Sequence, residues 1–177
     1  MKSEIIEKLK IPEGVELIRD AHLINAKGPK GENSRVIFHP KIKIEKNDEF
    51  IVLSAKKATK NEKTILNTLK AHIRNLIKGV NEGYEYKLKI CSGHFPMNVS
   101  VQGNELMIKN FFGEKKPRKT KIPQGVEVKV EGDIIRVEGV DIDAVSQTAS
   151  KIELTTRRTG FDRRIYQDGI WIIKKAK

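Results

Sequence analysis

Short runs in which apolar and polar residues alternate fill most of the first third of the chain. VELIR, HLINA, RVIFH, KIKIE and FIVLS, separated by Pro, Gly, Asn and Asp, predict five β-strands there. After Thr59 the spacing becomes helical, and the apolar positions are Ile65, Leu66, Leu69, Ile73, Leu76 and Ile77. Thr59 and Glu62 match a capping box, so we expect the helix to begin here and to end at Gly79 or Gly83.

The second half of the chain repeats this order. YKLKI, MNVSV, ELMIKNF, EVKVEG and IIRVEG predict five further strands. A second helix is expected with Asp141 as its N-cap and an end near Gly160, followed by a last strand within RIYQDGIWIIKKAK. LIRDAHL, VQGNELM and KVEGDII each place Gly, Asn or Asp between apolar runs, which predicts hairpin turns.

Two nearly identical hexapeptides, IPEGVE at 11–16 and IPQGVE at 122–127, raise the question of a repeat. A tandem copy in their register would leave too little chain after Ile122 for a second unit. An offset of 84 residues instead aligns Pro12 with Pro96 and Ile51 with Ile135, so that the hexapeptides open different hairpins. We therefore expect an α+β fold of two similar domains from internal duplication, 1–83 and 84–177, each an antiparallel β-sheet covered by one α-helix.

Composition narrows the class of partner. The 177 residues include 35 Lys and Arg against 23 Asp and Glu, a net charge of +12, which favours a polyanion as partner. A Lys-rich surface on an ordinary enzyme is the alternative. A single cysteine, Cys91, excludes an internal disulfide, and neither a signal-peptide core nor an 18-residue apolar run is present. We expect a cytoplasmic protein that does not contact a membrane.

Little in the sequence supports catalysis or a bound metal. The histidines at positions 22, 39, 72 and 94 are scattered, and Cys91 with His94 is the only close pair of zinc-ligand residue types. A zinc site needs three or four protein ligands. GPKGENS at 28–34 contains Gly and Lys but lacks the spacing of a phosphate-binding loop. We therefore expect no enzyme, no metal and no cofactor.

Basic residues cluster in three segments of the second half, although the two halves carry similar net charge. The clustered residues are Lys115, Lys116, Arg118, Lys119, Lys121, Arg157, Arg158, Arg163, Arg164, Lys174, Lys175 and Lys177. Such side chains contact phosphates and release counterions from nucleic acid. Phe95, Phe111, Phe112, Phe161 and Tyr166 lie beside them and are candidates either for stacking on bases or for the core. Recognition of folded RNA by shape and phosphate contacts is the expected function.

Three longer stretches resemble the archaeal and eukaryotic type of large ribosomal subunit protein six: NFFGEKKPRKTKIPQGVEVKVEGDIIRVEGVD, QTASKIELTTR and DRRIYQDGIWI. The resemblance runs from about Ile5 to Lys175, and R-x-Y-x-D-G-I-W at 164–171 is its most specific part. It implies two similar α+β domains and a structural constituent of the large subunit without catalytic activity. It also implies binding to large-subunit rRNA near the sarcin-ricin loop and the base of the factor-binding stalk, chiefly through the C-terminal domain.

The resemblance further implies which residues face the RNA. It adds the loop of Ser92, Gly93 and His94 to the basic segments. Partners would be rRNA and neighbouring ribosomal proteins of the stalk base, with no obligate homo-oligomer. Ser146 and Trp171 depart from the glycine and tyrosine that are commoner in the family, but both lie outside the basic segments. An RNA-binding or protein-interaction module outside the ribosome is the alternative function.

Overall fold

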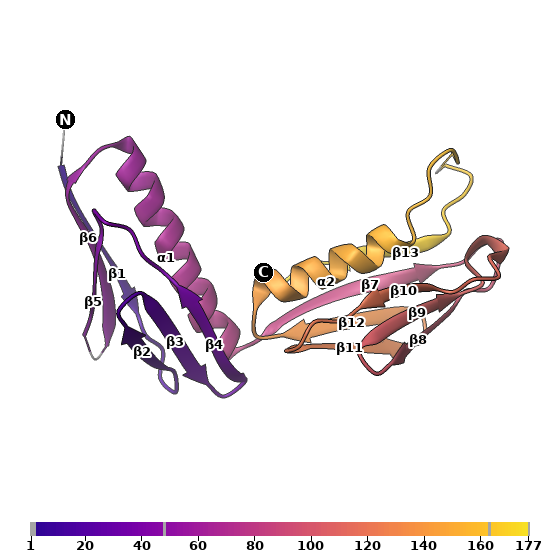
Figure 1. Ribbon diagram of the computed structural model, residues 1–177, viewed down its shortest axis with the longest axis horizontal. Helices are drawn as coiled ribbons and strands as arrows, with labels where there is room; N and C mark the ends of the chain where they lie inside the picture. Colours follow the sequence, from indigo (N-terminus) through magenta and orange to yellow (C-terminus); the bar gives the residue numbers. More distant parts are fainter. Residues whose placement is uncertain (1–2, 48, 163, 177) are drawn as a thin grey trace. The chain divides into compact units, whose positions relative to one another are not determined.

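In the described part of each half of the chain, six strands come before one helix in the sequence, and this helix lies over the strands (Figure 1). The computed structural model describes residues 3–47, 49–162 and 164–176. The chain divides into two compact units, Met1–Gly83 (unit 1) and Tyr84–Lys177 (unit 2). In both units the sheets are antiparallel, which confirms the α+β fold of two similar domains.

The described part of unit 1 contains six strands in two three-stranded sheets, ordered β1-β6-β5 and β2-β3-β4. The strands are β1 (Ser3–Lys10), β2 (Glu16–Asp20), β3 (Leu23–Gly28), β4 (Gly31–Val36), β5 (Lys43–Lys46) and β6 (Phe50–Ala58). Strand β1 was not predicted, because Glu7 occupies an inward position of its alternation. The Glu7 carboxylate lies 2.7 Å from Nζ of Lys70 on the helix, which pairs this half-buried charge.

Helix α1 (Lys60–Asn81) packs on strands of both sheets in unit 1. It begins as predicted: the Glu62 carboxylate accepts the Thr59 backbone N–H at 3.0 Å. Hydrogen bonds from Lys41 and Thr59 lower the pKa of Glu62 to about 2. Leu66 and Ile73 are fully buried, whereas the predicted Leu69 is only half-buried. The helix ends before Gly83, whose φ of +78° suits glycine.

Unit 2 repeats the strand order of unit 1 and adds one strand. Its elements are β7 (Tyr84–Cys91), β8 (Asn98–Gln102), β9 (Glu105–Lys109), the 3₁₀ turn η1 (Phe111–Gly113), β10 (Arg118–Lys121), β11 (Val126–Glu131), β12 (Ile134–Gly139), α2 (Ile142–Thr155) and β13 (Gly169–Lys174). The sheets run β10-β9-β8 and β11-β12-β7-β13, which match β4-β3-β2 and β5-β6-β1 of unit 1. This correspondence supports duplication, and β13 is the addition.

The two hexapeptides fold into the same turn at different places in the two units. The Val15 N–H donates to the Pro12 carbonyl at 3.3 Å, and the Val126 N–H donates to the Pro123 carbonyl at 3.4 Å. The third turn residues, Gly14 and Gly125, have φ of +85° and +81°, a conformation that favours glycine. The first turn leads into β2 and the second into β11, so the hexapeptides open different hairpins, as predicted.

All three predicted hairpin turns are present. The residues that flank the two-residue loops pair across the strands: Asp20 with Leu23, Gln102 with Glu105, and Glu131 with Ile134. Their short loops fix the register of each hairpin. The strand pairing of the fold was therefore partly predictable from turn residues alone.

Helix α2 begins where it was predicted but ends earlier. The Asp141 carboxylate accepts the Asp143 N–H at 3.0 Å, and Val145, Ala149 and Ile152 are fully buried. The helix stops at Thr155 rather than near Gly160. Thr156, directly after the helix, ends it: its buried hydroxyl donates to the Glu153 carbonyl at 3.0 Å and accepts the Ile170 N–H of β13 at 2.9 Å. The chain therefore leaves the helix at this residue and continues as a loop.

Candidate nucleic-acid interface

Three segments of unit 2 that are distant in sequence meet at one end of its sheets. The ring of Tyr166 lies 5.0 Å from that of His94, 5.1 Å from that of Phe161 and 6.1 Å from that of Phe112. These rings come from the segment after β7, from η1, and from the loop between α2 and β13, which Figure 1 shows in yellow. We call residues 92–97, 110–117, 156–162 and 164–168 the loop end of unit 2.

A buried carboxylate, Asp168, holds the loop after β7. Its Oδ1 accepts the Gly93 N–H at 2.7 Å and the His94 N–H at 2.9 Å, and its Oδ2 lies 2.6 Å from His94 Nδ1. Burial opposes ionisation of Asp168, which is 6% exposed, but the hydrogen bonds from His94 and Gly93 outweigh burial and its pKa is lowered. Because an ionised carboxylate only accepts, His94 Nδ1 carries the proton.

Asp168 lies within the most specific motif of the sequence, but no role was predicted for it. Its partners stand more than 70 positions earlier in the chain, so no local pattern predicts these contacts. The only local signal is a polar residue directly before an apolar strand. The predicted loop of Ser92, Gly93 and His94 is thus ordered by a residue that the prediction omitted.

Arg118, predicted to face RNA, is engaged inside the protein. Its guanidinium contacts both carboxylate oxygens of Glu114, at 2.8 and 2.6 Å, and donates to the Thr155 carbonyl at 2.6 Å. It also lies 4.4 Å from the ring centroid of Phe111. The hydrogen bonds from Arg118 lower the pKa of Glu114. Arg118 therefore joins β10 to the end of α2, through three of its five N–H groups.

Strand β10 alternates, so Arg118 and Thr120 lie on the face towards α2, and the other two basic residues of the strand lie on the opposite face. Thr120 points towards α2 and shares a hydrogen bond of 2.7 Å with Thr155, while Lys119 and Lys121 are exposed. Nζ of Lys119 lies 3.2 Å from the Glu105 carboxylate. Lys115 and Lys116 precede the strand and are exposed. Within this cluster, only these two lysines belong to the loop end.

The arginines after α2 belong to the loop end and differ in their contacts. The Arg158 guanidinium lies 4.2 Å from the ring centroid of Phe161 and 5.0 Å from that of Phe112. Arg157 is exposed. Arg164 forms an ion pair of 2.7 Å with Asp162, which raises the pKa of Arg164 and lowers that of Asp162. The predicted Arg163 lies outside the described residues.

The basic tail lies away from the loop end. Strand β13 starts with Gly169 opposite Cys91 and reaches Lys174 opposite Lys87, four residues along β7, so Lys174 is about 13 Å from Gly169 along the strand direction. Nζ of Lys174 lies 3.4 Å from the Glu85 carboxylate, and Lys175 is exposed. The predicted Lys177 lies outside the described residues. The structure thus separates the tail from the other two basic segments.

Five of the predicted basic residues are exposed and form neither an ion pair nor a ring contact within the part of the chain that the structure describes. They are Lys115, Lys116, Lys121, Arg157 and Lys175. Lys115, Lys116 and Arg157 belong to the loop end. Like charges gathered without counterions repel one another and favour an anionic partner. The loop end therefore offers cations beside a cluster of aromatic rings.

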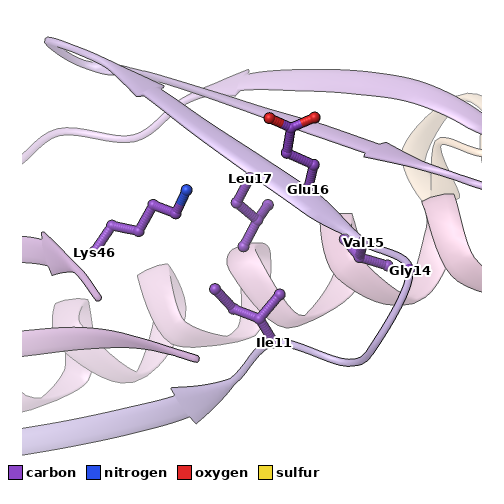
Figure 2. A pocket seen from close by; sticks show the side chains of 6 residues that line it. All are labelled: Ile11, Gly14, Val15, Glu16, Leu17 and Lys46. Carbon is purple, nitrogen blue, oxygen red and sulfur yellow. The ribbon is translucent and has the colours of Figure 1, made fainter. Parts of the chain in front are cut away.

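Cavities lie in both units, and one of about 350 Å³ in unit 2 is lined by Glu153, Leu154, Arg157 and Trp171. A crevice of about 20 Å³ at the loop end, lined by Phe112, Tyr166 and Trp171 among others, has room for about one water molecule. Figure 2 shows a larger cavity in unit 1, about 320 Å³, where Glu16 and Lys46 are the only ionisable lining residues. The described residues contain no group of three metal-ligand side chains. No helix among them is long and apolar enough to span a membrane.

Comparison with known proteins identifies the family of the chain. The model of the family described as ribosomal protein L6 matches residues 11–83 and 95–169, one segment in each unit. Over 176 residues, 99% of this chain and 100% of the relative, the chain is 46% identical to large ribosomal subunit protein uL6 of Methanosarcina mazei. It is 45% identical to the protein of that name from Sulfurisphaera tokodaii, over 97% of this chain and 92% of the relative. The chain belongs to the ribosomal protein L6 family.

Proposed function

We propose that the chain is a structural constituent of the large ribosomal subunit and binds large-subunit rRNA through the loop end of unit 2. The relatives carry the large subunit in their names, and the chain has a net charge of +12. The observation that carries the RNA proposal is the convergence of three segments around Tyr166, with Lys115, Lys116 and Arg157 exposed and unpaired within the described residues. The protein is then a component of cytoplasmic ribosomes and catalyses no reaction itself.

Contact with RNA at this site takes place on the surface. The crevice among the rings is too small for a base, so lysine and arginine contact phosphates while the exposed Phe161, backed by Arg158, offers a face for stacking. The tail around Lys175 would form a second, separate contact. The family resemblance adds the finer proposal that the RNA lies near the sarcin-ricin loop and the stalk base, beside other ribosomal proteins.

The salt dependence of binding tests the site. Lys115, Lys116 and Arg157 are replaced by Ala, and binding of the full chain to purified large-subunit rRNA is measured at several salt concentrations. Removing one phosphate contact should lower the slope of log K against log salt by about 0.7–0.9. The control replaces the exposed Lys43, Lys56 and Lys57 of unit 1 by Ala, which removes the same amount of positive charge. Equal weakening by both triple variants would mean that net charge alone drives binding.

Sedimentation separates the ribosomal function from the alternative, an RNA-binding module outside the ribosome. A constituent should migrate with the large subunit through a high-salt wash that removes loosely bound factors. Release of the protein into the free fraction would favour the alternative. The variant with Lys115, Lys116 and Arg157 replaced by Ala, called the loop-end variant, gives a second readout, because it should dissociate from the subunit at lower salt than the unit 1 control.

A further inference from the structure

An apolar patch lies exposed on one face of unit 1, the unit that takes no part in the loop end. Val36 is 71% exposed, Phe38 56% and Ile18 41%. The strand register connects them: Val36 pairs with Leu23, and Ile18 pairs with Asn25, two residues further along β3. Leu23 therefore lies beside Val36 and diagonally from Ile18 on the same face of the sheet β2-β3-β4.

This patch is not needed for the core of unit 1. The opposite face of the same sheet buries Leu17, Ile24 and Ala26, each at most 2% exposed. Successive side chains of a strand point to opposite faces, so the outer face has its own apolar residues in addition to those buried on the inner face. Exposed apolar clusters of this kind mark interaction sites.

The patch is held in place by its own contacts. The rings of His22 and Phe38 lie 4.0 Å apart, and between Val36 and Phe38 the buried Ile37 donates its N–H to the His22 carbonyl at 2.7 Å. The hairpin turn and the end of β4 are thereby joined. A partner would meet a preformed surface, which reduces the entropy lost on binding.

The charge of this face is opposite to that of the chain as a whole. Strand alternation places Glu16, Asp20, Glu32 and Lys27 on it, and Lys27 is paired with Glu32 at 2.9 Å. The face is therefore net acidic on a protein of net charge +12. A phosphate backbone would be repelled here, and a second copy of the chain would place the same acidic side chains against each other.

We infer that this face, centred on Val36 and Phe38, docks a segment of a neighbouring ribosomal protein in which apolar side chains are flanked by lysine or arginine. Apolar contacts supply the centre of such an interface, and the acidic rim selects a basic partner. This inference rests on the proposed function, since it takes the chain to be part of the large subunit. It assigns to unit 1 a protein contact, whereas unit 2 contacts RNA.

Crosslinking within the subunit identifies the occupant. A photoreactive benzoylphenylalanine replaces Val36, and large subunits that contain the full-length variant are irradiated and analysed by mass spectrometry. The expected product joins position 36 to a Lys- or Arg-rich segment of another ribosomal protein. Crosslinks only to rRNA, to a second copy or to an acidic segment would overturn the inference, as would no crosslink. Ile6 is the matched control, because it is exposed on the other sheet opposite Ser54.

Affinity measurements separate this inference from the RNA proposal. Val36→Ser with Phe38→Ser should weaken binding to large subunits that lack the protein by at least about tenfold, while leaving binding to naked rRNA unchanged. Ile6→Ser should change neither. Equal weakening on naked rRNA, or none on subunits, would overturn the inference. Val36→Ser alone repeats the test without disturbing the His22–Phe38 contact. The rRNA affinity of the loop-end variant is measured independently, so that the RNA proposal is tested apart from this inference.

Discussion

Units 1 and 2 share one strand order but differ in the segment after the helix. In unit 1, α1 has 22 residues and leads at Gly83 to the end of the unit. In unit 2, α2 has 14 residues and is followed by the 156–168 loop and β13, which pairs with β7. The corresponding edge of β1 has no such strand in the described part of unit 1. The difference between two otherwise similar units is therefore an appended segment.

The appended segment organises parts of the fold that unit 1 also has. Tyr166 and Asp168 belong to it, and they contact the loop after β7 and the turn after β9. The connections that correspond in unit 1 have no added segment to gather them. In the proposed function, the RNA-binding surface is therefore found in only one of two similar units, because the segment after α2 orders loops whose counterparts in unit 1 lack such a segment.

The largest expected effect tests whether β13 belongs to the core of unit 2. Ile170 is fully buried, so Ile170→Ala should lower the free energy of unfolding by about 2–5 kcal/mol. Trp171 is the only tryptophan, and its fluorescence during denaturation reports unit 2. Ile173→Ala on the same strand removes an exposed side chain and should cost less than about 0.5 kcal/mol. Equally small effects of the two variants would mean that β13 is only loosely attached.

The next effect concerns the hydrogen bonds of Asp168, in the appended segment, to Gly93 and His94 in the loop after β7. Asp168→Asn removes the charge that accepts three hydrogen bonds and should destabilise unit 2 by about 1.5–3 kcal/mol at neutral pH, as well as weaken rRNA binding. Unchanged stability together with full rRNA affinity would show that the loop is ordered without Asp168. Trp171 fluorescence and rRNA binding over a range of salt concentrations provide both readouts.

The stability contributed by the Asp168 carboxylate should depend on pH in a defined direction. The pKa of Asp168 is lowered from its ordinary value of 3.8, so the unfolded state binds the proton more readily than the folded state. Stability from this carboxylate is complete above about pH 5 and is lost as the pH falls through the folded-state pKa. The destabilisation by Asp168→Asn should therefore shrink as the pH falls below about 5 towards about 3. A difference that stays constant over this range would exclude the ionised carboxylate as the cause.

Features set by neighbouring residues were predictable, and those set by distant ones were not. The start of α1 depends on Thr59 and Glu62, three positions apart, and was predicted. The end of α2 depends on Arg118 and Ile170, so it was misplaced by several residues. Clustering predicts a phosphate contact for Arg118, but sequence alone does not show that its guanidinium also contacts Glu114 and Thr155. The convergence at Tyr166 likewise requires the tertiary fold.

The smallest effect compares the same hairpin turn in both units. The first loop residue is Ala21 in unit 1, with φ of +47°, and Gly103 in unit 2, with φ of +59°. Positive φ strains a residue that has a Cβ, whereas glycine adopts it freely but loses more entropy on folding. Ala21→Gly should therefore stabilise unit 1 by about 0.5–1 kcal/mol, and Gly103→Ala should destabilise unit 2 by a similar amount. Hydrogen exchange of β3 and β9 amides measures each unit separately. The same sign of change in both variants would show that the two turns are not equivalent, and the structural repeat would then fail at this hairpin.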